Sequence, residues 1–323
     1  MGFAERLRKM LNMSDDRGNR IMITGALGYI GSHTAVELIE AGFEVCLVDN
    51  LSCTNIDVLE GIEKITDVKP VYENIDCKDF VAMDKFMSKI GGIKAVIHCA
   101  ALKNEESSGG NPLAYYRNNI GSLLTLLELL PIHRINHLIC SVPKAEDNDS
   151  VYHSSLVMCE RIINDAMKVN TELICTIVHH AAAIGAHPTS LIGFSGERGD
   201  LQIDVARVAA GKGESVVVRE DRVREYIDIM DIAKTHRHII EVEQKERLVK
   251  QNLTSGCRLS DIEFVKMFEQ ENKVKVGLDI IGKAPENADG LKEAMKNIWR
   301  WQLHLEDMES EGKQKQGHLL GGS

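Results

Sequence analysis

Three glycines between a short apolar run and an amphipathic segment restrict the fold of this chain more than any other feature. Gly25, Gly28 and Gly31 are spaced three residues apart, directly after Arg20–Thr24 and at the start of Tyr29–Ala41. The first glycine permits a tight turn, the second lets a pyrophosphate approach the backbone, and the third lets a helix lie close to the strand. The N-terminus of that helix offers free N–H groups and a positive dipole end to phosphate. The pattern predicts a dinucleotide-binding turn.

An acidic residue supports this interpretation. A second apolar run, Glu44–Val48, ends at Asp49, which follows Gly31 by 18 residues. A carboxylate at that place accepts hydrogen bonds from an adenosine ribose, and it would repel the 2′-phosphate of NADP. We therefore expect NAD as the cofactor, the alternative being a glycine turn that serves packing alone.

Strands and helices alternate through the first half of the chain. The strands expected beyond Asp49 are 69–72, 94–98, 137–140 and 172–178, and the helices are 80–89, 112–130 and 155–168. Alternation of this kind indicates βαβ units and, with right-handed crossovers, a doubly wound parallel sheet. The fold class is thus α/β, with a Rossmann domain predicted at 19–178.

The pattern is looser after residue 178. We expect helices at 201–211, 231–246, 260–271 and 290–304, and strands at 215–219 and 249–253. They predict a smaller α/β lobe at 179–309, with elements that return to the first domain, and a frayed polar tail at 310–323. Residues 1–18 form an N-terminal extension, in which 3–13 have the spacing of an amphipathic helix. That extension packs on a partner, belongs to a targeting segment, or is loosely docked.

Composition excludes several classes of protein. With 44% apolar and 27% charged residues among 323, the chain is neither disordered nor fibrous. A net charge of −10 disfavours nucleic acid as a partner, and no apolar run approaches the length of a membrane span. The eight cysteines include no C-x-x-C pair, which suggests reduced thiols in the cytoplasm or in an organelle matrix such as that of mitochondria. The histidine pairs 133/137 and 236/238 lack further ligands, so we predict no metal site.

The segments 25–33 and 48–51 closely resemble the UDP-glucose/galactose 4-epimerases, which are extended short-chain dehydrogenase/reductases that hold NAD tightly. The likeness continues at 96–103, 112–119, 184–188, 223–233 and 298–302. It implies NAD contacts from Gly25, Gly28, Tyr29, Ile30 and Gly31 at the pyrophosphate, Asp49 and Asn50 at the adenosine ribose, and Asp76 and Cys77 at the adenine. It further implies that Cys99, Ala100 and Ala101 line the cofactor, that Lys103 reaches the second ribose, and that Asn119 sits in the cleft.

The catalytic residues that the resemblance implies are only partly present. The family uses a tyrosine with a lysine one helical turn later, whose charge favours the phenolate, and a nearby serine. Here Tyr152 is present, Leu156 stands at the lysine position and Pro143 at the serine position. Ser141 is retained, and because 141–152 is shorter than in the family, it stays open whether Ser141 serves instead.

The substrate side is reduced as well. Arg224 matches the arginine that grips the diphosphate of a UDP-sugar in the family, although an ion pair with Glu225 or Asp228 is an equal alternative. The substrate asparagine is replaced by Ala182, and the family's Arg-Glu-Gly-Asp segment has no counterpart between residues 277 and 292.

Three functions stay open. The chain is an NAD-binding pseudoenzyme that serves as an accessory or regulatory subunit, a divergent epimerase in which Lys144 or His153 replaces the lysine, or an interaction scaffold without cofactor. The resemblance implies a homodimer through the helices at 112–130 and 155–168, and the same surface would suit a heteromeric assembly.

Overall fold

The described part of the chain covers most of its length. The structure is a computed structural model that describes residues 18–102, 110–144, 150–196, 200–219, 222–281 and 292–320. The predicted helix at 3–13, Lys103, and the shortened segment around 283–287 lie outside the described residues.

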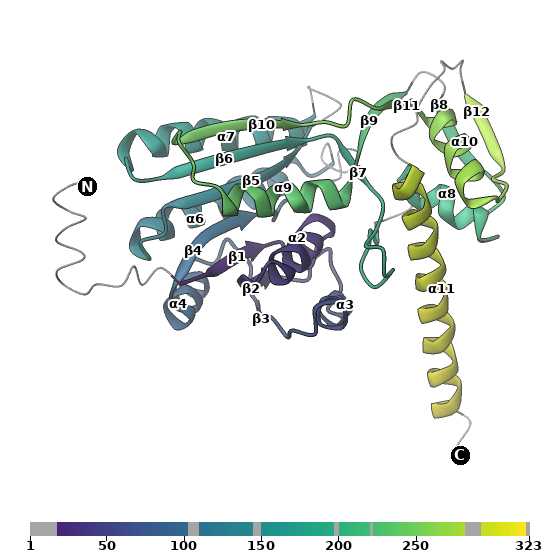
Figure 1. Ribbon diagram of the computed structural model, residues 1–323, viewed down its shortest axis with the longest axis horizontal. Coiled ribbons are helices and arrows are strands. Elements are labelled where there is room, and N and C mark those ends of the chain that lie inside the picture. Colours follow the sequence, from purple (N-terminus) through teal and green to yellow (C-terminus); the bar gives the residue numbers. More distant parts are fainter. Residues whose placement is uncertain are drawn as a thin grey trace.

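Seven strands form the main sheet, in the order β10-β6-β5-β4-β1-β2-β3 (Figure 1). They are β1 (Arg20–Thr24), β2 (Glu44–Asp49), β3 (Val71–Asn74), β4 (Ile93–His98), β5 (His137–Pro143), β6 (Ile174–His180) and β10 (Leu248–Leu253). All neighbouring pairs in this sheet are parallel. The strand order reverses between β1 and β4, and the crevice at the carboxyl ends of these two strands is where such sheets bind ligands.

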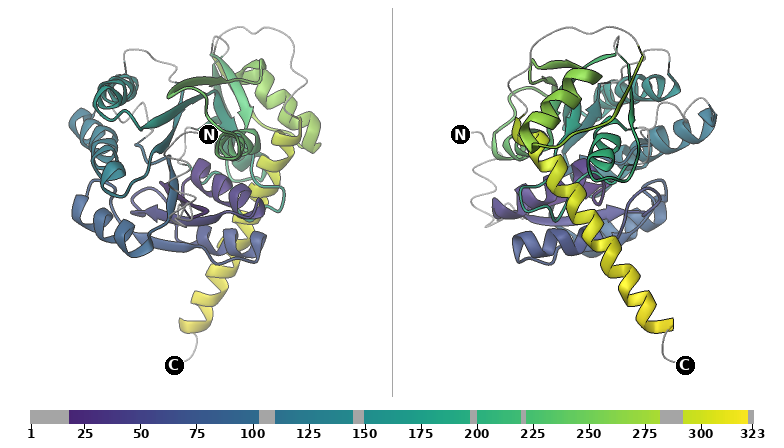
Figure 2. Two further views of the ribbon diagram at one scale, coloured as in Figure 1. Left: turned by 60° about the vertical axis from the view of Figure 1, so that its left-hand side comes forward. Right: turned by 90° about the vertical axis from the view of Figure 1, so that its right-hand side faces the viewer.

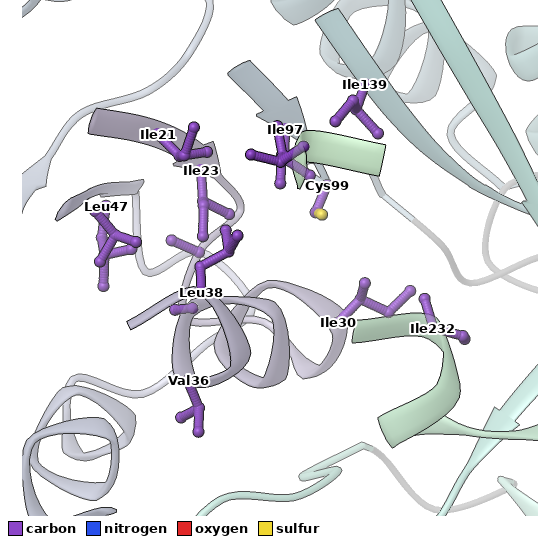
Figure 3. Packing of buried hydrophobic residues seen from close by; sticks show 14 of the residues in the cluster. Ile21, Ile23, Ile30, Val36, Leu38, Leu47, Ile97, Cys99, Ile139 and Ile232 are labelled. Carbon is purple, nitrogen blue, oxygen red and sulfur yellow. The ribbon is translucent and has the colours of Figure 1, made fainter. Parts of the chain in front are cut away.

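Helices cover both faces of the sheet. One face carries α2 (Tyr29–Glu40), α3 (Asp57–Thr66) and α9 (Ile229–Glu241), and the other carries α4 (Phe80–Ile90), α6 (Pro112–Ile132) and α7 (Val151–Val169). Side chains alternate along a strand, so Ile21 and Ile23 of β1 join the first apolar core while Met22 joins the second. Figure 3 shows Ile30 of α2 beside Ile232 of α9 in the first core. The predicted doubly wound parallel sheet is confirmed.

A smaller lobe follows β6. It contains a three-stranded sheet of β7 (Ala182–Ile184), β9 (Val223–Asp228) and β11 (Arg258–Ser260), and a two-stranded sheet of β8 (Val216–Arg219) and β12 (Leu278–Ile281). Its helices are α8 (Leu201–Ala209), α10 (Asp261–Asn272) and α11 (Lys292–Leu320). The chain returns to the large domain through α9 and β10, which lie between β9 and β11 in the sequence. Among the described residues, no helix has the length and apolar character needed to cross a bilayer.

Several elements differ from those expected, and strands β7, β9, β11 and β12 of the smaller lobe were not predicted. Helix α7 begins at Val151 rather than 155, because Ser150 caps it through the backbone amide of His153. Helix α3, rich in charged residues, was not predicted. Helix α11, expected to end at residue 304, continues to Leu320 and extends beyond the rest of the molecule (Figure 2). Glu, Lys, Gln and Leu in this segment favour helix, and it contains no proline.

Candidate functional site

The glycine turn lies where β1, α2 and β4 meet. Gly25 has a φ of +63°, and a Cβ on it would come within 2.7 Å of the Ala100 backbone. A Cβ on Gly31 would lie 2.3 Å from the carbonyl oxygen of Gly25. The N-cap of α2 is Gly28, which has no side chain to bond the first amides of that helix. The cradle therefore fits a pyrophosphate, and two of its glycines have no room for a side chain.

Asp49, at the end of β2, binds the turn and the loop that follows the strand. Its carboxylate accepts hydrogen bonds from the backbone amides of Leu27 at 3.0 Å and Leu51 at 2.9 Å, and from the Thr54 hydroxyl at 2.7 Å. The residue is 5% exposed. Oδ2 receives only the Leu27 bond among these three, so it keeps capacity for a ribose hydroxyl.

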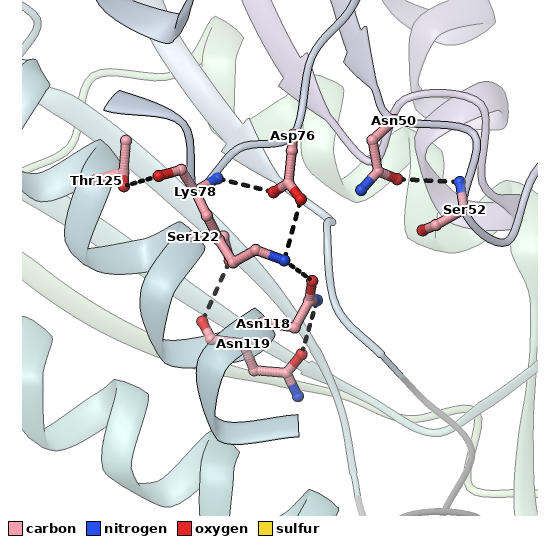
Figure 4. A network of polar contacts seen from close by, with 8 residues as sticks. All are labelled: Asn50, Ser52, Asp76, Lys78, Asn118, Asn119, Ser122 and Thr125. Atoms are coloured by element: carbon pink, nitrogen blue, oxygen red, sulfur yellow. Dashed lines mark hydrogen bonds and ion pairs between the residues drawn. The ribbon is translucent and has the colours of Figure 1, made fainter. Parts of the chain in front are cut away.

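A polar network occupies the predicted adenine end (Figure 4). The Lys78 ammonium group lies 3.0 Å from Asp76 Oδ2 and donates to Asn118 Oδ1 at 3.2 Å. Burial would raise the pKa of Asp76, but hydrogen bonds from Lys78 and from the Asn50 side chain hold it below its usual value. Burial, with the charges of Asp76 and Asp49, raises the pKa of Cys77 to about 12. This thiol is therefore uncharged at neutral pH.

A cavity opens beside this network. It has a volume of about 500 Å³ and is lined by Lys78, Leu102, Ala114, Arg117, Asn118 and Gly121. Gly121 lets the lysine stem lie against α6, because a Cβ there would be 3.3 Å from Lys78 Cγ.

The side chains of Tyr29 and Ile30 point away from the turn. The Tyr29 hydroxyl donates to the carbonyl oxygen of Gly185 at 2.7 Å, and its ring lies 5.0 Å from that of Phe194. Burial and then the charges of Asp228 and Asp200 raise the pKa of Tyr29 well above 10. Ile30 is 3% exposed and belongs to the apolar core. Their backbone amides, at the start of α2, are the groups left for a pyrophosphate.

The residues expected along the other side of the crevice are brought together. Cys99 and Ala100 follow β4, and their backbone lies against Gly25; Ala101 comes next. Asn119 is buried, and its amide accepts from Leu102 N at 2.8 Å while donating to Leu102 O and to Ser155 Oγ. Both amide hydrogens are thus engaged within the protein, so Asn119 holds the segment that follows β4 against α7.

Tyr152 lies in an apolar cluster. It is 3% exposed and packs with Tyr115 and with Leu156, which is 8% exposed. The partly buried residues around these three are Leu102, Val142 and Val151. Tyr152 and Leu156 share one face of α7 because they are four residues apart.

Ser141 and Pro143 belong to β5. Pro143 is its last residue, in register with His180 of β6. Ser141 Oγ is buried and has no hydrogen-bond partner within the described residues. Both lie at the carboxyl end of the strand, on the side of the crevice.

The two carboxylates expected near Arg224 each accept a hydrogen bond from the backbone. Glu225 accepts from the Gly256 amide at 3.1 Å, and Asp228 caps α9 through the Met230 amide at 2.9 Å. Burial raises the pKa of Asp200, the N-cap of α8, while the hydrogen bond from the Gln202 amide and the charge of Arg224 act in the opposite direction. The sequence reasoning missed Asp200, although an aspartate just before an apolar helical run is a common helix start. Across the described ranges, no three His, Cys, Asp or Glu side chains gather in a way that suits a metal ion.

Residues 21–250 match the model of the NAD dependent epimerase/dehydratase family. The UDP-glucose 4-epimerase of Dictyostelium discoideum is 31% identical over 322 residues, which cover 90% of this chain and 93% of that protein. The UDP-glucose 4-epimerase of Bacillus subtilis is 30% identical over 327 residues, covering 87% of this chain and 96% of that protein.

Two solved structures of UDP-glucose 4-epimerases are also similar to this chain. UDP-glucose 4-epimerase from Stenotrophomonas maltophila, with bound NAD and formylated UDP-arabinopyranose, has a TM-score of 0.82 and 26% identity, covering 90% of this chain and 99% of that one. The enzyme from Bifidobacterium longum, in complex with NAD⁺ and UDP, has a TM-score of 0.80 and 26% identity, covering 88% and 98%.

Proposed function

The chain belongs to the NAD dependent epimerase/dehydratase family, and on that premise we propose that it binds NAD without interconverting UDP-sugars. Its role is that of a non-catalytic accessory or regulatory subunit. The similar proteins are UDP-glucose 4-epimerases, and two similar structures contain NAD. The family resemblance read from the sequence is thereby confirmed.

The cofactor half of the site supports NAD binding. The uncapped start of α2 offers backbone amides to the pyrophosphate, and Gly25 and Gly31 hold that start close to β1 and β4. Asp49 Oδ2 accepts one hydrogen bond, from the Leu27 amide, and has capacity for a second from a ribose hydroxyl. Bound there, NAD would supply a nicotinamide that accepts or returns a hydride. Its adenine would lie by Asp76 and Cys77.

The position of Tyr152 carries the proposal that catalysis is lost. Sugar epimerisation needs a group that takes a proton from a hydroxyl, and a free phenol has a pKa of about 10. A neighbouring cation would lower that pKa. In this chain the residue one turn later is Leu156, and the ring of Tyr152 is buried against Tyr115 and Leu156. An apolar neighbour gives the phenolate no stabilisation.

The second lobe would still take a nucleotide ligand. Arg224 stands on β9 at the position that the family uses for a diphosphate. The similar structures bind UDP or a UDP-sugar, which supports a nucleotide-sugar as the ligand class. The substrate asparagine of the family is absent, because Ala182 occupies its place in β7.

Two measurements test the proposal. Purified protein is denatured, and the released NAD is quantified by an enzymatic assay; we expect close to one NAD per chain. The intact protein is then mixed with UDP-galactose, with the Bacillus subtilis relative as the positive control. Formation of UDP-glucose at an ordinary enzymatic rate, abolished by Tyr152→Phe, would contradict the loss of catalysis. Protein that releases no NAD would support the scaffold alternative instead.

A further inference from the structure

The loop that follows β7, residues 185–194, contacts both lobes of the molecule (Figure 1). On the side of the second lobe, Trp301 Nε1 of α11 donates to the carbonyl oxygen of Phe194 at 2.6 Å. A Cβ on Gly193 would lie 2.4 Å from the Trp301 ring, so the loop rests directly on the indole. On the side of the large domain, Ile192 is fully buried in the first apolar core. We therefore call this segment the bridging loop.

Tyr29 binds the bridging loop from the start of α2. Its hydroxyl donates to the carbonyl oxygen of Gly185 at 2.7 Å, and its ring lies 5.0 Å from that of Phe194. The ring also meets that of His33, one helical turn later, edge-on at 5.3 Å. Tyr29 is at the same time the first residue of α2, where backbone amides are available to a pyrophosphate. One residue thus gives its backbone to the cofactor cradle and its side chain to the bridging loop.

The other contacts of the bridging loop with the large domain involve different elements. Leu191 lies against α3, where a Cβ on Gly61 would come within 2.4 Å of its carbonyl oxygen, and Ile192 enters the core. Gly185, by contrast, comes directly after β7, whose last residue pairs with Asp228 of β9. The hydrogen bond from Tyr29 therefore joins the glycine turn to the strand pair that carries Ala182 and Arg224.

We propose that Tyr29 is a positioning residue that transmits the occupancy of the glycine turn to the second lobe. The inference rests on the proposed function in one respect, that NAD occupies the turn. A ligand held by the first amides of α2 restricts the motion of that turn, and the phenol of Tyr29 extends the restriction to Gly185 and β7. The two sites then share a coupling free energy. In a regulatory subunit, this would let NAD stabilise the nucleotide side of the crevice.

Hydrogen–deuterium exchange, followed by mass spectrometry of peptides, tests the proposal. The full chain is freed of NAD with charcoal and compared with the same protein reloaded with NAD. In the wild type, NAD should slow exchange about fivefold or more in β7 as well as in α2, which is the lower end of the usual coupling between two sites. In Tyr29→Phe the slowing of α2 should remain, and that of β7 should fall below about twofold, since one hydrogen bond accounts for about a fivefold change.

The difference between loaded and unloaded protein separates coupling from a purely structural role. A hydroxyl that only stabilised the fold would change the exchange of β7 equally with and without NAD. Tyr29→Phe keeps the ring and the backbone amide, so NAD content should be unchanged. Tyr72→Phe is the matched control, because it removes another bond from a phenol to a carbonyl oxygen, that of Asp49 at 3.3 Å, within the large domain. It should leave the NAD effect on β7 as in the wild type.

Three results would overturn the proposal. They are equal slowing of β7 by NAD in the wild type and in Tyr29→Phe, no slowing of β7 in the wild type, and loss of NAD from Tyr29→Phe. Turnover of UDP-galactose is measured on the same samples. Turnover contradicts the proposed function but leaves the exchange comparison valid, whereas a wild type that binds no NAD contradicts both.

Discussion

The carboxylate of Asp49 accepts a hydrogen bond from the backbone amide of Leu27 at 3.0 Å, so the end of β2 is tied to the glycine turn. Asp49→Ala would remove this bond and those from Leu51 and Thr54. We expect a loss of about 2–4 kcal/mol in the free energy of unfolding, because buried donors are left unpaired. Released NAD should fall as well. Urea unfolding and the NAD assay measure the two effects, and a variant with wild-type NAD content would contradict the role given to Asp49.

The variants Gly25→Ala and Gly42→Ala form a matched comparison. Both have positive φ, +63° and +85°, but a Cβ on Gly25 would collide with Ala100 while one on Gly42 meets nothing within 4 Å. Gly42→Ala should cost only the backbone strain, about 1 kcal/mol. Gly25→Ala adds displacement of the turn, so it should cost about 3 kcal/mol and most of the bound NAD. Equal losses in the two variants would show that contact with Ala100 has no part.

Leu156 tests the apolar cluster around Tyr152. Leu156→Lys places an ammonium group among Tyr115, Tyr152 and their neighbours, and we expect it to destabilise the protein by about 3 kcal/mol without restoring turnover. Leu156→Met conserves volume and should cost under about 1.5 kcal/mol. Denaturant midpoints and the UDP-galactose assay provide the comparison. A stable, active Leu156→Lys would mean that one substitution separates this chain from an epimerase.

Three buried histidines make stability depend on pH. Burial lowers the pKa of His33 and of His236 to about 3, and that of His98 to about 4. The unfolded chain takes up these protons near pH 6.5, whereas the folded chain does not. Stability is therefore complete above about pH 6.5 and falls as pH is lowered, by about 1.4 kcal/mol per histidine for each unit down toward the folded pKa. Urea unfolding between pH 7.5 and 5 measures the slope.

A variant isolates one histidine. His236→Gln removes one of the protons that the chain takes up on unfolding. The slope of the free energy of unfolding against pH, between pH 6 and 5, should therefore become shallower by the equivalent of about one proton per chain. The Thr34 hydroxyl, 2.9 Å from His236 Nδ1, retains a polar partner in glutamine. A slope that does not change would mean that His236 is already charged in the folded protein.

The large domain was predictable because its signals are local. Glycines at the turn, an apolar run before them and an acid at the end of the next strand fix β1, α2 and β2 within a few residues. The small lobe was not predictable in this way. Strands β7 and β11 have three residues each, and their pairing with β9 depends on contacts between residues distant in sequence.

The candidate site also has a part that the sequence predicts and a part that it does not. The residues at the glycine turn and at Asp49 follow from spacing, but the directions of side chains do not. Nothing in the sequence indicates that Tyr29 reaches Gly185, or that the Asn119 amide is bound within the protein.

The place of β10 in the main sheet has a consequence during synthesis. This strand lies beside β6, yet it leaves the ribosome some seventy residues later, after much of the second lobe. A nascent chain that ends before Leu253 exposes β6 as an open edge, which is a template for association with other chains. Translation that stalls between the two strands would therefore demand chaperone protection, even though the glycine turn is already complete.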